Sequence, residues 1–494
     1  MPEEFFEPLS DNKTPPTYKF FNGSAWVSGS GGKTTPVTSP IDQSVVGNLP
    51  VATTEEIDDV ITKLKSAQPA WEQTPLNQRV KFMHLAADWI RHWEEYLTAL
   101  LVREIGKSME EAKSEMKRTA DLTDYFADEV QSLRGFSLDS DNFPGYDKGR
   151  LAMVERVAHG AVCAIAPFNY PVNLAASKIV PALLTGNTVL FKPPTQGGIS
   201  GVHLARIFEK AGLPHNVFAC VTGGGLEIGD YLVSHPGVDA IAFTGSSDTG
   251  VSIAGKAAMK PLLFECGGNN PAIVFPDADM NLAAREIVKG GFSYAGQRCT
   301  AIKYVLATKG VIDTLLPIVM QQIGELVKMG DPRSPETKLV GPVISVDVAQ
   351  KIQGRIDESV KLGATIVTGG KHNAAYVEPT VLTHVTPTMP VVVNEVFGPV
   401  VSFIEVTSMD KASHIVNGTR FGLQACVFTK DEGTGIVYAK SLNVGTVQIN
   451  GSPQRGPDHF PFLGVKHSGI GVQGVRYSLE AMSRLKPVVL NKPQ

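Results

Sequence analysis

The order of apolar and polar positions divides the chain into a helical region followed by two series of alternating strands and helices. Between residues 55 and 135, apolar residues recur three and four positions apart and charged residues fill the other face, which predicts amphipathic helices. From 160 to 275, short apolar runs alternate with helical stretches, and a second such series extends from about 266 to 470. A chain of 494 residues is too long for one hydrophobic core, so we expect two or three domains.

The first series predicts a mostly parallel sheet with helices on both faces. Its runs AVCAIAP, NTVLFKPP, NVFACVTG and DAIAFTGS are apolar, and each precedes a helical stretch. Glycines gather where these strands pass into helices, which is where open α/β sheets bind nucleotides. The hexapeptide GSSDTG at 245–250 differs from the G-x-G-x-x-G fingerprint, and taken alone it is more simply an ordinary tight turn.

Two further segments interrupt this alternation. The polar, Gly- and Pro-bearing stretch 136–150 predicts a loop or a domain boundary, and RLAMVERVAHGAVCAIAP after it predicts strand structure. Near the end of the chain, MSRLKPVVLNKP predicts an apolar strand at a sheet edge, which another subunit could complete.

Composition and charge exclude several classes of protein. Hydrophobic residues make up 43% of the chain and charged residues 19%, which argues against disorder and against a membrane protein. The formal charge of -4 offers no basic excess for nucleic acid or an anionic membrane. The N-terminus resembles neither a signal nor a transit peptide, and the C-terminus carries no lipidation or retention motif. The five cysteines include no C-x-x-C pair, so we expect a reducing, cytoplasmic location and no metal site.

One cysteine differs from the others in its surroundings. Cys163, Cys220 and Cys426 lie in apolar runs, and Cys266 lies beside glycines, so packing is the better interpretation for each of these four. Cys299 follows an arginine in the turn GQRCTA, and adjacent positive charge lowers a thiol pKa and favours the nucleophilic thiolate. Because most cysteines are inert, the local chemistry leaves both a structural and a catalytic role open.

Two other residues could complete a thiol mechanism. Asn169, in PFNYPVNL, supplies an amide donor at a strand end, which could stabilise an oxyanion. Glu265, in LFECGGNN, is a carboxylate in an apolar strand end, where burial would make it a stronger base for activating water. Each could instead be structural, but together with a nucleotide-type sheet they favour a covalent oxidoreductase.

The chain resembles the aldehyde dehydrogenase superfamily from about residue 19 to residue 492. The resemblance rests on PFNYPVNLAASKIVPALLTGN, FKPPTQ, FTGSSDTG, ECGGNNPAIVF, GQRCTA, NEVFGPVV and FPFLGVKHSGIG, in the family's order and spacing. It implies the family's α/β fold, with a Rossmann-like dinucleotide-binding domain, an α/β catalytic domain and a small β oligomerisation domain. The corresponding ranges are 1–138 with 160–264, then 265–472, and finally 139–159 with 473–494.

The resemblance also implies a role for individual residues. Cys299 matches the catalytic thiol, Glu265 the general base, and Asn169 the oxyanion-hole amide, which the Cys299 backbone N–H joins. Lys178 matches a lysine lining the site. The matches to cofactor-binding positions are Lys192 and Thr195 near the adenosine ribose, Gly245 and Ser246 at the pyrophosphate, and Glu395 and Phe397 beside the nicotinamide ribose.

A closer likeness is to the non-phosphorylating glyceraldehyde-3-phosphate dehydrogenases, through FSYAGQRCTAIK, KPPTQG and SPQRGPDHFPFLGVKHSGIGVQGV. In that pattern, four residues hold the substrate phosphate, and the matches are Arg118, Tyr170, Arg298 and Arg455. Thr195 stands where NAD-preferring relatives commonly carry glutamate, which implies NADP as cofactor. Two positions depart from the pattern: Cys266 replaces a leucine, and Asn269 stands where the subfamily tends to carry lysine.

The resemblance therefore implies irreversible oxidation of D-glyceraldehyde 3-phosphate to 3-phosphoglycerate by a homotetramer or homodimer. The nearest alternative is a dehydrogenase of another small aldehyde, such as lactaldehyde or succinate semialdehyde. A structural protein that keeps the fold without turnover is a second alternative, and the set of Cys299, Glu265 and Asn169 argues against it. A coenzyme-A-acylating enzyme is a third, but such enzymes typically lack the glutamate base.

Overall fold

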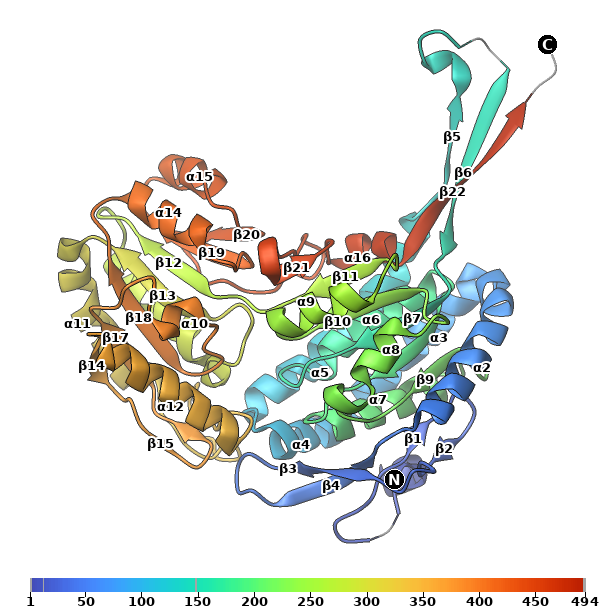
Figure 1. The fold of residues 1–494 in the computed structure, drawn as a ribbon, viewed down its shortest axis with the longest axis horizontal. Helices are drawn as coiled ribbons and strands as arrows, with labels where there is room; N and C mark the ends of the chain where they lie inside the picture. Colours follow the sequence, from blue (N-terminus) through green and yellow to red (C-terminus); the bar gives the residue numbers. More distant parts are fainter. Residues whose placement is uncertain (1, 12, 147–148, 492–494) are drawn as a thin grey trace.

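The computed structural model describes residues 2–11, 13–146 and 149–491, and it consists of two α/β lobes and a projecting β arm (Figure 1). The first lobe holds an eight-stranded sheet of order β2-β1-β9-β8-β7-β10-β11-β21. Its five central strands are parallel, and β1, β2 and β21 join its edges in antiparallel fashion. The strands are β1 (Phe20–Phe21), β2 (Trp26–Val27), β7 (Ala161–Ile165), β8 (Thr188–Lys192), β9 (Phe218–Cys220), β10 (Ala240–Thr244), β11 (Leu262–Glu265) and β21 (Gly469–Ile470).

The strands predicted between 160 and 275 are present, and every residue of β7, β8 and β10 is buried. Strands that are apolar throughout can be buried on both faces only if helices cover both sides of the sheet. The helices of this lobe are α2 (Thr54–Gln73), α3 (Leu76–His92), α4 (Glu94–Ile105), α5 (Met109–Glu129), α6 (Asn173–Leu184), α7 (Gly198–Lys210), α8 (Asp230–Ser234), α9 (Ser247–Lys256) and α16 (Val475–Ala481). The predicted helix at LEIGDYLVS is a π-helical turn, Gly225–Gly229, that continues into α8.

The second lobe is built around a seven-stranded sheet of order β14-β17-β18-β13-β12-β19-β20, parallel except for β14. Its strands are β12 (Asn270–Val274), β13 (Ile302–Ala307), β14 (Thr365–Thr368), β17 (Thr380–Thr383), β18 (Val400–Glu405), β19 (Gln424–Phe428) and β20 (Thr446–Ile449). Its longer helices are α10 (Met280–Phe292), α11 (Lys309–Leu326), α12 (Val346–Lys361), α14 (Met409–Gly418) and α15 (Glu432–Lys440).

The arm is a three-stranded antiparallel sheet of β5 (Phe136–Asp139), β6 (Arg150–Ala158) and β22 (Ser483–Asn491), with β6 in the centre. The predicted strand near the C-terminus is thus β22, and its last predicted residues, 492 and 493, lie outside the described residues. Of the two alternatives predicted for 136–150, a loop or a domain boundary, the loop is wrong at its start, because pairing with β6 draws 136–139 into a strand. Residues 147 and 148 lie outside the described residues. The long apolar run after residue 150 divides between β6 in the arm and β7 in the first lobe.

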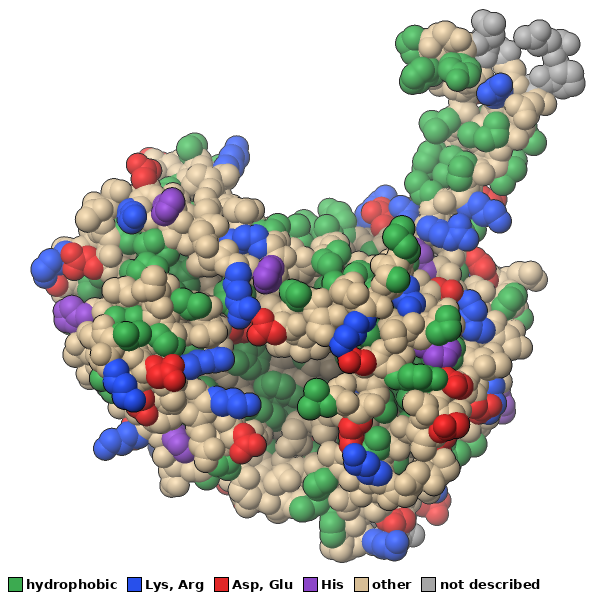
Figure 2. Space-filling model, in the orientation of Figure 1, with side chains coloured by type: hydrophobic (Ala, Val, Ile, Leu, Met, Phe, Trp, Pro, Cys, Tyr) green, Lys and Arg blue, Asp and Glu red, His purple; other side chains and the backbone are tan. Residues whose placement is uncertain are grey.

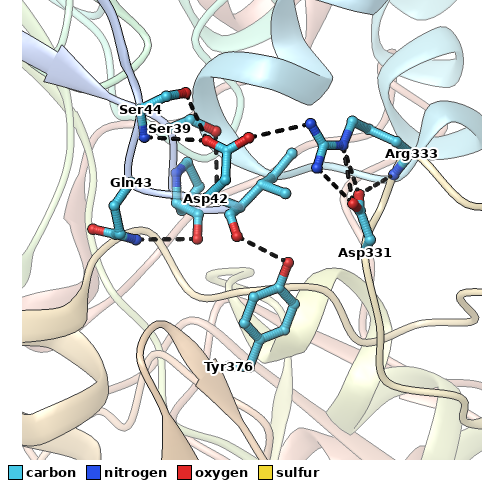
Figure 3. Close-up of polar contacts among 9 residues, drawn as sticks. Ser39, Asp42, Gln43, Ser44, Asp331, Arg333 and Tyr376 are labelled. Atoms are coloured by element: carbon cyan, nitrogen blue, oxygen red, sulfur yellow. Dashed lines mark hydrogen bonds and ion pairs between the residues drawn. The ribbon is translucent and has the colours of Figure 1, made fainter.

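A polar network connects the two lobes at the turn between β3 (Thr34–Thr38) and β4 (Val45–Pro50) (Figure 3). Nη1 of Arg333 donates to Oδ2 of Asp42 at 3.2 Å, while Nη2 of the same guanidinium lies 2.7 Å from Oδ2 of Asp331. The Tyr376 hydroxyl donates to the Ile41 carbonyl at 3.3 Å. None of the described helices is both long and apolar enough to cross a membrane.

Candidate active site

The two sheets direct their strand ends toward a hollow between the lobes, visible near the centre of Figure 2. A cavity of about 460 Å³ lies there. Six of the predicted residues line it, from the ends of β7 and β10 and from two loops of the second lobe: Asn169, Gly245, Ser246, Cys299, Glu395 and Phe397. The structure therefore brings the predicted nucleophile, the amide donor and most predicted cofactor residues to one place.

The turn that carries Cys299 has an unusual backbone. Tyr294, Ala295 and Gly296 have positive φ angles of 50°, 51° and 67° in succession. A Cβ on Gly296 would lie only 2.2 Å from the Gly398 carbonyl oxygen, so a side chain does not fit there. Asn270 fixes the other side of the turn, because its Nδ2 donates to the carbonyls of Cys299 and Ala301 at 2.8 Å each.

This turn places the Cys299 Sγ 3.7 Å from Oε1 of Glu265, the last residue of β11. Burial raises the pKa of the Cys299 thiol, and the negative charges of Glu265 and Glu395 raise it further, while Arg455 and Arg298 lower it by less. Arg298 does lower the thiol pKa, as expected from the sequence. The net pKa is nevertheless raised, because burial has the largest effect.

The Arg298 guanidinium lies against its own loop. Its Nη1 donates to the Ser293 hydroxyl at 2.6 Å and its Nη2 to the Thr300 hydroxyl at 3.2 Å. These contacts hold the cation next to the nucleophile's turn.

Glu265 has one carboxylate oxygen available for a reaction. Its side chain is almost completely buried, and within the part of the chain that the structure describes no group hydrogen-bonds Oε2. Nη2 of Arg455 is 3.8 Å from this oxygen and also donates to Oε1 of Gln473 at 3.0 Å. Nearby, burial lowers the pKa of Lys178 to about 7, an effect that the negative charge of Glu265 opposes.

Asn169 follows β7 and is oriented by the loop that carries Cys299. Its Nδ2 donates to the Gln297 carbonyl at 3.0 Å. An amide nitrogen has two hydrogens, so one can fix the side chain while the other reaches a ligand in the cavity.

The remaining predicted phosphate residues form a second group. Arg118 and Tyr170 line a larger cavity of about 850 Å³, which Arg333 also lines. Nη2 of Arg118 donates to the Arg455 carbonyl at 3.2 Å and to Oδ2 of Asp458 at 3.0 Å, so the Arg118 guanidinium contacts the backbone of Arg455.

The predicted cofactor residues also fall into two groups, since some line the smaller cavity and others do not. Ser246 caps α9, where its Oγ accepts from the Thr249 N–H at 3.2 Å, and it opens this helix N-terminus toward the smaller cavity. Lys192 and Thr195 do not line that cavity. Lys192 ends β8, where burial lowers its pKa to about 8 and Nζ donates to the Pro193 carbonyl at 3.1 Å.

Sequence reasoning missed Lys303, a fully buried lysine in β13. Its Nζ donates to the carbonyls of Gly296 and Gly398 at 2.7 and 3.0 Å, so it joins the nucleophile's turn to the segment carrying Glu395 and Phe397. Burial lowers the pKa of Lys303 to about 7 and raises that of Glu395 to about 7. The sequence does contain a sign of this buried lysine, because Lys303 lies inside the apolar run AIKYVLA.

The two departures from the family pattern have structural explanations. Cys266 is buried, and its Sγ occupies space beside α9 where a Cβ on Gly250 would lie 2.5 Å away. Burial raises the pKa of Cys266 to about 12, and the residue also lines the smaller cavity. Asn269 donates from Nδ2 to the Val392 carbonyl, which ties the Glu265 strand end to the second lobe.

Comparisons with known proteins agree with this geometry. The model of the aldehyde dehydrogenase family matches residues 26–488. An NADP-dependent glyceraldehyde-3-phosphate dehydrogenase of Triticum aestivum is 42% identical over 96% of this chain and 96% of its own length. One from Streptococcus equinus is 42% identical over 92% of this chain and 95% of its own. The crystal structure of NADP-dependent glyceraldehyde-3-phosphate dehydrogenase from Bacillus halodurans, complexed with NADP, has a TM-score of 0.93 at 44% identity and covers 96% of this chain and 99% of its own. These matches confirm the predicted family resemblance and fold class.

Proposed function

The chain belongs to the aldehyde dehydrogenase family, and from that premise we propose that it oxidises D-glyceraldehyde 3-phosphate to 3-phosphoglycerate with NADP. The observation that carries the proposal is a meeting of three side chains. Glu265 has the Cys299 Sγ 3.7 Å from one carboxylate oxygen and Nη2 of Arg455 3.8 Å from the other. A nucleophile, a base and an anion-binding guanidinium thus lie together, as conversion of a phosphorylated aldehyde to an acid requires. The relatives from Triticum aestivum and Streptococcus equinus bear the name of this activity.

In the proposed reaction, the Cys299 thiolate adds to the aldehyde carbon. The Asn169 amide and the Cys299 backbone N–H donate to the developing oxyanion. NADP, when bound, would supply the acceptor for the hydride, and Cys299 would then hold the substrate as a thioester. Glu265 then takes a proton from water, which attacks the thioester and releases 3-phosphoglycerate without consuming inorganic phosphate.

The residues around the smaller cavity fit a dinucleotide, and two residues outside its lining, Lys192 and Thr195, fit an additional phosphate. The N-terminus of α9, with Gly245 and Ser246, opens into the cavity and presents backbone N–H groups of the kind that bind phosphate. Lys192 supplies a buried cation at the end of β8, and Thr195 is a small, uncharged residue that would not repel a 2′-phosphate.

We also propose that the chain forms a homotetramer or homodimer through its arm. β22 is an edge strand, and its side chains are exposed, with Leu485 at 48% and Val489 at 51%. Apolar side chains on an unpaired edge favour a second copy of the chain as the partner. Light scattering after gel filtration, on the full chain and on a Leu485→Asp, Val489→Asp variant, tests this: the variant should elute as a smaller species.

The division into domains remains part of the proposal: a dinucleotide-binding domain over 1–138 and 160–264, a catalytic domain over 265–472, and an oligomerisation domain over 139–159 and 473–494. So does a cytoplasmic location, which the unpaired cysteines favour.

The alternative substrates are lactaldehyde and succinate semialdehyde. A panel of these aldehydes with D-glyceraldehyde and D-glyceraldehyde 3-phosphate, assayed with NADP and with NAD, separates the possibilities. The proposal requires the highest kcat/KM for D-glyceraldehyde 3-phosphate with NADP. A higher kcat/KM for an unphosphorylated aldehyde would contradict it.

A further inference from the structure

A fully buried ion pair lies beneath the proposed phosphate site. Lys107, which follows α4, places its Nζ 2.5 Å from Oε2 of Glu115 in α5, and neither side chain is exposed to solvent. Neither residue belongs to the proposed catalytic or phosphate-binding set. Because desolvation offsets most of the attraction between buried charges, such a pair is weak evidence for a role in stability alone.

The cation of this pair lies against the face of a proposed phosphate ligand. Nζ of Lys107 is 3.4 Å from the centre of the Tyr170 ring and 4.9 Å from that of Tyr294. A cation on a ring face fixes the ring and draws electron density from it, which makes the phenol hydroxyl a stronger hydrogen-bond donor. Tyr170 lines the larger cavity together with Arg118.

The anion of the pair holds the backbone next to Tyr170. Oε1 of Glu115 accepts from the N–H groups of Val172 and Asn173 at 3.1 Å each. These are the residues at the start of α6, so Glu115 secures one end of the segment that carries both Asn169 and Tyr170. The pair thus contacts Tyr170 through its cation and this segment's backbone through its anion.

We propose that Lys107 and Glu115 are positioning residues that aim and polarise the Tyr170 hydroxyl toward the substrate phosphate. The inference rests on the proposed function, since it assumes a phosphorylated aldehyde. In this role the pair helps to discriminate phosphorylated from unphosphorylated substrate. It acts through Tyr170 and contacts neither substrate directly.

The test compares kcat/KM for D-glyceraldehyde 3-phosphate and for D-glyceraldehyde in variants of the full chain. Replacing one partner alone would leave a buried charge uncompensated and risks misfolding. The principal variant is therefore Lys107→Met with Glu115→Gln, which removes both charges while the glutamine oxygen can still accept from Val172 and Asn173. Lys117→Met, an exposed lysine of α5, is the matched control for loss of a positive charge.

We expect the double variant to lose about three- to thirty-fold in kcat/KM for the phosphorylated substrate, through KM, if the cation's effect on the ring has its usual size. The value for D-glyceraldehyde should change much less, and the Lys117 control should match wild type for both. The triple variant, which combines the double variant with Tyr170→Phe, should lose no more in total kcat/KM than Tyr170→Phe alone, because the pair acts through that hydroxyl. Lys107→Arg with Glu115 intact should restore part of the discrimination.

Two results would overturn the inference: an unchanged ratio of the two kcat/KM values in a folded double variant, or fully additive losses with Tyr170→Phe. Failure of the proposed function is distinct from either, because wild type itself would then show no preference for the phosphorylated aldehyde.

Discussion

The Sγ of Cys299 lies 3.7 Å from Oε1 of Glu265, so the proposed nucleophile and the proposed base share one partly buried contact. The same carboxylate that can activate water also disfavours the thiolate, since its charge raises the pKa of Cys299. In this arrangement burial and the negative charge of Glu265 both favour the thiol form of Cys299.

Replacing Glu265 with Gln should shift the pH dependence of Cys299 alkylation to lower pH. The pKa of the thiol is raised by burial first and by Glu265 next, so removing that negative charge lowers the pKa and increases the thiolate fraction at a given pH. The rate of iodoacetamide labelling of the cofactor-free protein, followed against pH, measures this. Cys299→Ala identifies the labelling that belongs to other cysteines, and a midpoint that stays or rises would contradict the electrostatic account.

Substitutions of Cys299 and Glu265 should have different effects in pre-steady-state kinetics. Cys299→Ala removes the nucleophile, so thioester formation should cease. Glu265→Gln keeps the nucleophile but removes the base, so rapid mixing should show a burst of about one NADPH per active site followed by little turnover. Unimpaired steady-state turnover in Glu265→Gln would mean that another group activates the water.

Arg455→Ala should reduce selection for the phosphate. Losing one partner of a desolvated, charge-assisted contact typically costs about 2–5 kcal/mol, or roughly thirty-fold to several thousand-fold in kcat/KM for D-glyceraldehyde 3-phosphate. Because Arg455 also lies 3.8 Å from Glu265, activity on D-glyceraldehyde should change too, but by less. The ratio of the two kcat/KM values is the decisive measurement. Arg455→Lys keeps the charge without the forked geometry and should give an intermediate ratio. If Arg455→Ala kept the wild-type ratio of the two kcat/KM values, Arg455 would not be a ligand of the substrate phosphate.

Thr195→Glu should convert a preference for NADP into one for NAD. A carboxylate there would face the 2′-phosphate, and like charges in contact cost several kcal/mol, so kcat/KM for NADP should fall by about ten-fold or more while that for NAD changes little. The control is Thr195→Gln, because glutamine has the shape of glutamate without its charge. Equal losses with both cofactors would show that the position does not read the ribose phosphate.

The sequence predicted the first lobe well because its strands are apolar throughout. Periodicity alone identifies such runs, and β7, β8 and β10 are completely buried, as predicted. β5 was missed because its four residues are all exposed, and only pairing with β6 makes them a strand.

In the candidate site, too, local sequence predicts some residues, whereas others are brought together only by the fold. Motif order predicts Cys299 as the nucleophile and Glu265 as the base, but no local pattern could show that Arg455 meets Glu265 from 190 positions away, since only the fold brings them together. The pattern between residues 55 and 135 predicts that charged residues lie on the face opposite the apolar one, and nothing in it distinguishes Lys107 and Glu115 from charges that face water. The structure buries both, together with Glu104, whose carboxylate accepts from the Ile199 and Ser200 N–H groups.

The backbone of the nucleophile's turn also limits how this protein can evolve or be engineered. A Cβ on Gly296 would lie 2.2 Å from the Gly398 carbonyl oxygen, and one on Gly268 would lie 2.6 Å from the carbonyl oxygen of Cys299 itself. In a saturation library, active clones should therefore retain glycine at both positions, whatever substrate is used for selection. New substrate ranges are better sought by diversifying the walls of the larger cavity, where side chains such as Lys113 and Lys338 can be exchanged without moving the sulfur.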